Sequence, residues 1–279
     1  MISVVICSRN RAAGLDRTLA RWAELVADPA FEMIVVDDGS TDRTTEIVAQ
    51  AADRFGARLR SARTHGLGLG AARNIGWRMA GGDIVFFTDD DCYPGTGLLE
   101  AVRACFADPQ VAFIGGQLLP ATPEHAGVAV VTRSYRVEVA GPGFVPAGLI
   151  PGANMAIRRL ALEQIGGFDP EFGAGTPFPA EDVDVIARLA AGGFRGAYDP
   201  GPKVVHDHDR LTESAQRRLR HQYSRGRGAY YAKCLLDPRL RRSYLRAWLH
   251  SATRSIPHTI VELGGALRYW FRPRRPRPS

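Results

Sequence analysis

Short apolar runs alternate with amphipathic stretches in the first part of the chain. The runs ISVVIC, FEMIVV, ARLRSA and DIVFF have the composition of β-strands, and the stretches between them, at 12–25, 42–55 and 69–79, space their apolar residues as helices do. This alternation predicts βαβ units and a mostly parallel, Rossmann-like central sheet flanked by helices, which is an α/β fold. Ligands of such folds bind beyond the carboxyl ends of the strands.

A less regular half follows. VAFIGG, which starts at Val111, predicts another strand, and shorter strands are expected at 154–157 and 195–205. Glycine and proline are dense over 141–152, which predicts a mobile loop.

From residue 211 the pattern becomes helical and basic, and it ends in the tail RPRRPRPS, which we expect to be extended and disordered. Two interpretations of the helices are open. Basic helical runs most often form solvated surfaces. Large apolar residues nonetheless interleave with arginines here, as in a helix that lies on a membrane surface. They are Trp248, Leu249, Ile256, Ile260, Leu263, Leu267, Tyr269, Trp270 and Phe271, with Arg254 and Arg268 among them.

The composition limits the class of protein. The chain has 279 residues, 45% of them hydrophobic, which suits one large globular domain or one domain with an appended segment. Its 36 Lys and Arg against 29 Asp and Glu give a net charge of +7, which favours anionic partners such as nucleotides, phospholipid headgroups or nucleic acid. Charge alone does not choose among these partners.

The cysteines and the start of the chain bear on the compartment. Cys7, Cys92, Cys105 and Cys234 are widely spaced, which argues against a disulfide framework or a zinc knuckle and favours a reducing cytosol. The opening run ISVVIC is too short for a signal peptide, and no apolar run approaches the roughly 20 residues that span a bilayer. We expect a cytoplasmic protein, with peripheral contact at the inner membrane surface as the alternative.

Carboxylates gather where predicted strands end. Asp37 and Asp38 follow FEMIVV and precede a glycine turn, where they either bind a ligand or merely cap and turn the chain. Asp89, Asp90 and Asp91 follow DIVFF, and three adjacent carboxylates repel one another unless a cation or hydrogen-bond donors compensate them. As alternate residues, Asp89 and Asp91 can point the same way and share a divalent ion with a diphosphate.

Further clusters lie downstream. Glu181 and Asp182 begin the amphipathic stretch EDVDVIARLAAGG, where carboxylates serve either as helix caps or as a catalytic base. The HDHD run at 206–209 offers His206 as a metal ligand or a structural residue. The glycine-rich GLGLGAARNIG loosely matches a dinucleotide loop. It follows a third βα unit and not the first strand, so a dinucleotide site is disfavoured.

In order and spacing, these clusters resemble the family 2 glycosyltransferases, which have the GT-A fold. VVICSRNR resembles the family's first strand and nucleotide loop, VVDDGSTD its second loop, and GAARNIGWRMAGGDIVFFTDDDC the segment that ends in its DxD motif. PGANMAIRR, IGGFDPEF and AEDVDVIARL resemble its acceptor-side segments and its ED motif. The resemblance covers residues 1–210 and implies a nucleotide-binding half at 1–118 and an acceptor-side half at 119–210. Residues 211–279 would be a basic helical appendage.

The resemblance assigns a role to each matching position. The nucleotide side would be formed by Ser8, Arg9, Asp37, Asp38, Arg73, Asp89 and Asp90. Asp37 would bond the base or ribose, and Arg73 the base or phosphate. The ligands of a Mn²⁺ or Mg²⁺ ion would be Asp89, Asp91 and His206, with the register inside the aspartate triplet open by one position. Asp182 would be the general base, oriented by Glu181.

The implied activity is an inverting transfer of a sugar from a nucleoside diphosphate to an acceptor hydroxyl. UDP is the commonest donor nucleotide of the family, with GDP and dTDP as alternatives, and the acceptor would be lipid-linked, a glycan or a small molecule. Such enzymes build cell-surface glycans, glycolipids or secondary metabolites. The leaving diphosphate needs a cation beside it, and the acceptor hydroxyl needs a carboxylate to accept its proton. RHQYSRG has Gln222 without the tryptophan of the Q-x-x-R-W motif of processive synthases, which favours a single transfer.

Three other classes of protein account for fewer of these sequence features. A GT-A nucleotidyltransferase would attack the α-phosphate, but CSRNRAAG is a poor version of the glycine-rich basic loop that such enzymes carry. A nucleic-acid-binding protein would use the +7 charge and would leave the carboxylate clusters unexplained. A catalytically silent homologue is disfavoured because Asp89, Asp91 and Asp182 are all present.

Overall fold

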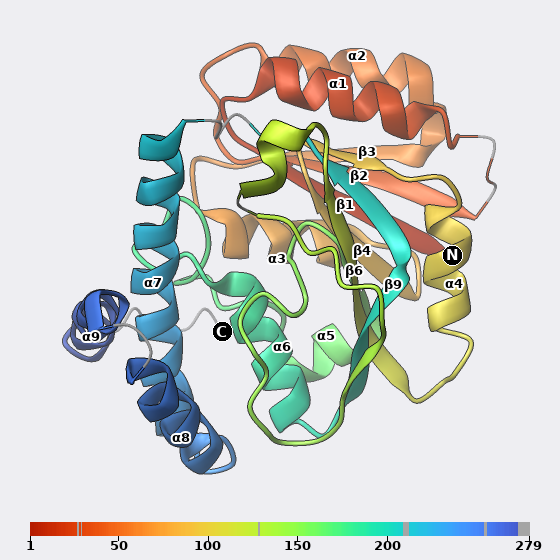
Figure 1. Ribbon diagram of the computed structural model, residues 1–279. Helices are drawn as coiled ribbons and strands as arrows, with labels where there is room; N and C mark the ends of the chain where they lie inside the picture. Colours follow the sequence, from red (N-terminus) through yellow and green to blue (C-terminus); the bar gives the residue numbers. More distant parts are fainter. Residues whose placement is uncertain (27, 29, 128, 209–211, 254–255, 273–279) are drawn as a thin grey trace.

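The computed structural model describes residues 1–26, 28, 30–127, 129–208, 212–253 and 256–272. Helices cover both faces of a central sheet, and the C-terminal helices α7, α8 and α9 lie along one side of it (Figure 1). The strands are β1 (Ile2–Ser8), β2 (Phe31–Asp37), β3 (Leu59–Arg63), β4 (Ile84–Asp89), β5 (Cys92–Pro94), β6 (Val111–Pro120), β7 (Val137–Val139), β8 (Met155–Arg158) and β9 (Arg195–His206). The helices are α1 (Ala12–Ala23), α2 (Thr44–Phe55), α3 (Leu69–Met79), α4 (Leu98–Cys105), α5 (Arg159–Ile165), α6 (Glu181–Ala191), α7 (Glu213–Leu236), α8 (Arg241–Ala252) and α9 (Ile256–Trp270), with 3₁₀ turns at Gly56–Arg58 and Pro123–Gly127.

The sheet has the strand order β3-β2-β1-β4-β8-β6-β9-β5, and β7 pairs with β9. The four strands β3, β2, β1 and β4 are parallel, as the alternating pattern predicts. The second half is mixed, because β8 runs antiparallel to β4 and β6 while β6 and β9 run parallel. The predicted α/β fold with a central sheet flanked by helices is therefore confirmed; the first half of the sheet is parallel, and the second half is mixed.

The elements that the sequence analysis did not predict are all short. Helices α4 and α5 have 8 and 7 residues, and strands β5 and β7 have 3 residues each. By contrast, β9 begins where expected and is the longest strand described, with 12 residues, because it pairs with β6, β5 and β7 along its length. The glycine- and proline-rich segment 141–152 contains neither helix nor strand, and its mobility stays a prediction.

Two apolar cores lie on opposite faces of the sheet. Side chains alternate along a strand, so Val4 and Ile6 of β1 join one core and Val5 joins the other. Helices α1, α2 and α4 cover the first core, and α3, α5 and α6 cover the second. This three-layer arrangement leaves the loops at the carboxyl ends of β1, β2 and β4 free to form a site.

A third core joins the C-terminal helices to the rest of the molecule. Tyr230 of α7 packs in it with Phe178, which lies just before α6. Lys233 of α7 lies 2.5 Å from Asp184 of α6 and 2.6 Å from Asp169. Among the described residues, no helix is both long enough and apolar enough to cross a membrane. The expected disorder of the Arg/Pro tail falls on 273–279, outside the described residues.

Helices α7 and α9 pack closely because glycines face the opposite backbone. A Cβ atom on Gly228 would lie 1.9 Å from the carbonyl oxygen of Glu262, and one on Gly265 would lie 2.1 Å from that of Arg225. Neither distance is compatible with a side chain, so any substitution here must move one helix away from the other.

Gly228→Ala is expected to lower the free energy of unfolding by about 1–3 kcal/mol, because α9 must shift to admit the methyl group. Gly264→Ala is the matched control: a Cβ there meets nothing within 4 Å, and alanine favours a helix over glycine. Denaturant unfolding of both variants measures the difference. Equal stabilities would contradict the close approach of the two helices.

Candidate functional site

A cleft opens at the carboxyl ends of β1 and β4. It consists of two hollows of about 230 Å³ and about 550 Å³. The residues that line both hollows are Leu69, Asp89, Ala174, Gly175 and His206. Because they share these walls, the two hollows form one continuous site.

The loops after β1 and β2 are bound to each other at the smaller hollow. Asn10 has a left-handed backbone (φ 55°); its Oδ1 accepts from the Thr41 N–H (2.7 Å) and its own N–H donates to Ser40 Oγ (2.9 Å). Ser8, the last residue of β1, and Arg9, on the loop that follows it, both line the smaller hollow, where the resemblance would place the nucleotide.

The two aspartates at the end of β2 point in different directions. Asp37 accepts hydrogen bonds from the Ser40 N–H (2.8 Å) and Thr45 Oγ (2.6 Å). Burial acts to raise the pKa of Asp37, but these bonds outweigh it and lower that pKa. Asp38 accepts from the N–H groups of Leu67 and Gly68, and it is Asp38 that lines the hollow. Contact of Asp37 with a base or ribose stays a prediction.

The middle carboxylate of the triplet, Asp90, is bonded to the first loop. Ser8 Oγ donates to its Oδ2 (2.6 Å), and Arg11 Nε lies 2.8 Å from its Oδ1. Burial raises the pKa of Asp90 to about 7, although the Arg11 charge acts in the opposite direction. Asp90 therefore holds in place the loop that would bind the nucleotide.

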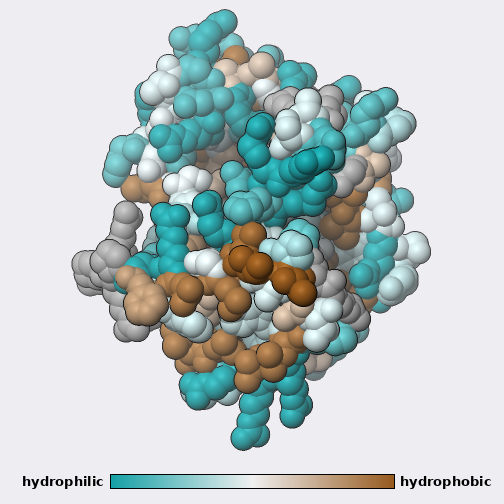
Figure 2. All heavy atoms as spheres, turned by 60° about the vertical axis from the view of Figure 1, so that its left-hand side comes forward, coloured by the Kyte–Doolittle hydropathy of each residue, from teal (hydrophilic) through white to brown (hydrophobic). Residues whose placement is uncertain are grey.

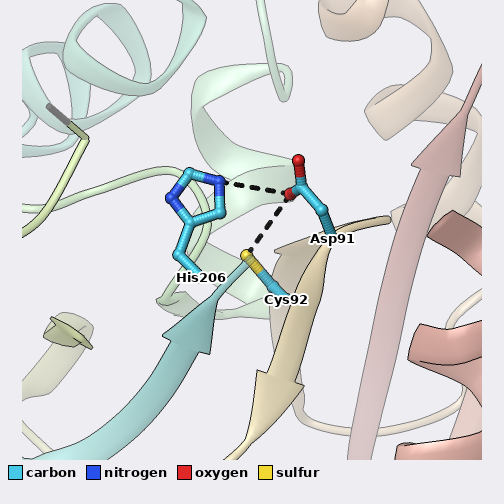
Figure 3. Close-up of side chains that lie close together, drawn as sticks. All are labelled: Asp91, Cys92 and His206. Atoms are coloured by element: carbon cyan, nitrogen blue, oxygen red, sulfur yellow. Dashed lines mark hydrogen bonds and ion pairs between the residues drawn. The ribbon is translucent and has the colours of Figure 1, made fainter. Parts of the chain in front are cut away.

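Asp91, Cys92 and His206 bring an oxygen, a sulfur and a nitrogen donor together (Figure 3). His206 Nε2 lies 3.2 Å from Asp91 Oδ1, and Cys92 Sγ lies 3.7 Å from the same oxygen. All three donor atoms lie within 4.8 Å of one another. Burial acts to lower the pKa of His206, but Asp91 outweighs it and raises that pKa. Carboxylate and imidazole at this spacing fit a divalent cation.

Arg73 connects the two ends of the cleft. Its guanidinium is 2% exposed; Nη1 lies 3.0 Å from Glu181 Oε1, and Nη2 lies 3.2 Å from Asp89 Oδ1 and 3.1 Å from the Gly152 carbonyl. Asp89 thus faces Arg73 and is not part of the three-donor group that the described residues form around Asp91. The expected contact of Arg73 with a base or phosphate stays a prediction, because these bonds go to protein groups.

Glu181 and Asp182 begin α6 at the wall of the larger hollow. Asp182 accepts from the Gly152 N–H (3.1 Å) and from the Val183 N–H (2.8 Å), which fixes both carboxylate oxygens. Burial raises the pKa of Asp182, and Arg73 offsets part of that rise. Burial likewise raises the pKa of Glu181, to about 7. A raised pKa is what a general base needs to accept a proton near neutral pH.

The other members of the HDHD run form a separate contact. Asp207 accepts from the Tyr93 hydroxyl (2.6 Å) and lies 3.3 Å from His125 Nε2. The His208 ring packs edge-on against those of His125 and His206. Asp209 lies outside the described residues. Of the three described residues of the run, only His206 lines the cleft.

Sequence reasoning missed several residues of the cleft. Arg11, whose Nη2 lies 2.7 Å from Asp91 Oδ2, is the last residue of VVICSRNR, and the resemblance assigns it no role. Cys92 directly follows the aspartate triplet, and its pairing in register with His206 brings it to the group. Helix α7 also contributes to the larger hollow, through Leu219, Gln222, Tyr223, Arg225 and Arg227. These contacts join residues that lie far apart in the sequence, so the sequence alone does not predict them.

The model of the family described as Glycosyl transferase family 2 matches residues 3–166. The chain belongs to glycosyltransferase family 2. The pre-mycofactocin glycosyltransferase of Mycobacterium tuberculosis is 32% identical over 216 residues, which are 74% of this chain and 43% of that protein. The validoxylamine A glucosyltransferase of Streptomyces hygroscopicus is 38% identical over 223 residues, 70% of this chain and 52% of that protein. This glycosyltransferase chain thus spans about half the length of these curated relatives.

Solved structures confirm the GT-A fold of this family 2 glycosyltransferase. The mannosyltransferase PcManGT of Pyrobaculum calidifontis, in complex with GDP-Man and Mn²⁺, superposes with a TM-score of 0.68 at 22% identity, covering 98% of this chain and 76% of that one. Residues 1–349 of TarS from S. aureus superpose with a TM-score of 0.67 at 18% identity, covering 96% of this chain and 80% of that one.

Proposed function

We propose that the chain transfers a sugar from a nucleoside diphosphate sugar, with UDP as the expected nucleotide, to an acceptor hydroxyl. The transfer would be metal-dependent and would invert the anomeric carbon in one displacement. The main support is the cleft itself, which has Asp91 and His206 in one hollow and Asp182 in the adjoining one. The fold neighbours were solved with GDP-Man and Mn²⁺ or with UDP-GlcNAc, and a relative is named a glucosyltransferase.

The smaller hollow would take the nucleotide and diphosphate. Asp91 and His206 would hold a Mn²⁺ or Mg²⁺ ion, which when bound neutralises the charge that grows on the leaving diphosphate. Arg11 adds a positive charge at the same place, since its guanidinium contacts both Asp90 and Asp91. Asp89, at the boundary of the two hollows, would face the ribose and the ion together.

The larger hollow would take the donor sugar and the acceptor. An acceptor hydroxyl is a weak nucleophile at neutral pH, so a fixed carboxylate must accept its proton as the new bond forms. Asp182 is held for this role by the N–H groups of Gly152 and Val183. Arg73 would act as a positioning residue, because it binds Glu181 and Asp89 and contacts neither hydroxyl nor sugar in this scheme.

Residues 1–210 would carry the transfer chemistry, and α7 from the segment after them would complete the acceptor wall. This wall combines Gln222 and Tyr223 with apolar residues such as Leu118 and Val131. A mixed surface of this kind suits the three acceptor classes that the resemblance implies, lipid-linked, glycan and small molecule.

Thermal denaturation with a panel of nucleoside diphosphates tests the donor half of the proposal. A nucleotide present at 100 times its Kd stabilises the folded state by about 2.7 kcal/mol, so we expect a rise in Tm that needs both Mn²⁺ and one nucleotide. The matching sugar nucleotide should then release nucleoside diphosphate on turnover. Release of pyrophosphate from a nucleoside triphosphate and a sugar phosphate would instead identify a nucleotidyltransferase and overturn the proposal.

A further inference from the structure

The solvent-facing side of α9 is its apolar side. Ile256, Ile260, Leu263, Leu267 and Trp270 follow one another at steps of three or four residues, which places them on one face of the helix. All five are exposed, Ile256 and Ile260 by 71% and 65%, and Phe271 directly after the helix by 83%. A helix of a globular protein normally turns such a stripe toward the core.

The opposite face of α9 is packed against the rest of the protein. Gly265 and Ala266 are buried where α9 packs on α7, and the buried Tyr269 ring contacts Phe172 and Phe178. Trp270, which is 45% exposed, also donates from Nε1 to the Ala232 carbonyl of α7 (3.4 Å), but the isoleucines and leucines of the stripe are not needed to hold α9 on the protein. Figure 2 shows hydrophobic side chains gathered over the lower half of this side of the molecule, where α8 and α9 lie, with long hydrophilic side chains projecting beside them.

Helix α8 extends this surface and adds positive charge. Leu245 and Leu249 are exposed, and Arg242 and Arg246 lie on the same face at helical spacing. Helix α8 has three arginines and α9 has one, against a single acidic residue, Glu262 of α9. Glu262 is buried and accepts from Trp248 Nε1 (2.8 Å) and Arg227 Nε (2.5 Å). The outer surface of the two helices is therefore apolar and cationic.

We propose that the face formed by α8 and α9 binds the surface of an anionic lipid bilayer. Exposed isoleucine, leucine, tryptophan and phenylalanine side chains would enter the boundary between headgroups and acyl chains, and the arginines would lie among the anionic headgroups. A second copy of the chain fits less well. Two copies of this face related by a twofold axis would bring arginines toward arginines, with no exposed carboxylate on either helix to pair with them.

The position of this face indicates what membrane binding would do for the enzyme. Helix α9 packs on α7 beside Arg225, and α7 lines the larger hollow with Gln222 and Tyr223. A bilayer on α9 would be separated from α7 by one helix, roughly 10 Å. Lipid binding would therefore hold the acceptor side of the cleft near the membrane surface.

Flotation of the full chain with vesicles tests the proposal without donor or acceptor, so the result is independent of sugar transfer. We expect binding to vesicles that contain phosphatidylglycerol, and at least about tenfold weaker binding to pure phosphatidylcholine or at high salt. The triple variant Ile260→Ser, Leu263→Ser, Leu267→Ser should lose about tenfold or more in affinity, and Arg242→Gln with Arg246→Gln should lose the dependence on anionic lipid.

Leu160→Ser is the matched control, since Leu160 is 64% exposed on α5, away from this face, and its loss should leave vesicle binding unchanged. Every variant should keep the Tm of the wild type, which separates loss of binding from loss of fold. No binding by the wild type, or equal binding by the triple variant, would overturn the proposal. A dimer in sedimentation that the triple variant converts to a monomer, without vesicle binding, would assign the face to a second copy.

Discussion

Asp182→Asn is expected to lower the rate of nucleoside diphosphate release from the sugar nucleotide by about 10²–10⁴-fold, the usual contribution of a general base. Asparagine keeps the shape of the side chain and, through its one oxygen, can still accept from one of the two N–H groups, Gly152 or Val183, but it cannot take a proton from the acceptor. The rise in Tm with nucleotide and Mn²⁺ should be retained. Turnover with water as acceptor allows the measurement before the natural acceptor is identified.

Asp53→Asn is a suitable control because Asp53 is an exposed carboxylate of α2, and its turnover should equal that of the wild type. The pH dependence gives an independent readout. The base must be ionised, so kcat/KM should fall as pH falls through the pKa of the Asp182–Glu181 pair, which burial raises above ordinary carboxyl values. Activity that stays constant down to about pH 4, where an ordinary aspartate titrates, would exclude Asp182 as the base.

Asp91→Asn should abolish the part of nucleotide binding that depends on Mn²⁺. It removes the charge at the only carboxylate of the three-donor group that the described residues form. We expect nucleotide affinity in Mn²⁺ to fall by about 100-fold or more, because even the substitution of residues that hydrogen-bond to metal ligands typically lowers metal affinity by about 10–100-fold. The measurement is nucleotide affinity by calorimetry with Mn²⁺ and with chelator. Affinity in chelator should change little.

Asp90→Asn is the matched control for this substitution. Its carboxylate is bonded to Ser8 and Arg11 and lies outside the three-donor group, so the variant should keep the Mn²⁺ dependence even if the loop is weakened. This pair of variants also settles the register of the aspartate triplet. Loss of Mn²⁺ dependence in Asp90→Asn, with Asp91→Asn unaffected, would move the ion to the neighbouring residue.

Much of the fold could be predicted because the spacing of apolar residues along the chain indicates both the type of each element and where it lies in the sequence. The bounds of α3 match the expected 69–79, since its apolar spacing is regular and a glycine turn precedes it. Strands β1, β2 and β4 end in polar residues, which placed Ser8, Asp37 and Asp89 at one edge of the sheet in advance. The mixed second half could not be predicted, because antiparallel pairing of β8 with β4 and β6 depends on contacts between distant segments.

The gathering of the candidate residues at one cleft was predictable from the sequence, but their individual contacts were less so. Sequence pattern alone treats Asp89 and Asp91 as equivalent alternate carboxylates, but Arg73 draws Asp89 toward α6 while His206 and Arg11 meet Asp91. Likewise, the segment after residue 210 has no local feature that marks α7 as a wall of the cleft. That role follows only from its packing against α6.

The buried guanidinium of Arg73 contacts both Asp89 and Glu181, so the charges in the two hollows of the cleft affect one another. The negative charge of Asp89 is among the causes that raise the pKa of both Glu181 and Asp182. Any positive charge that a donor complex brings beside Asp89 therefore favours ionisation of Asp182. Donor binding is therefore expected to increase the ionised fraction of Asp182, the form that takes the acceptor proton, which would favour addition of the donor before the acceptor.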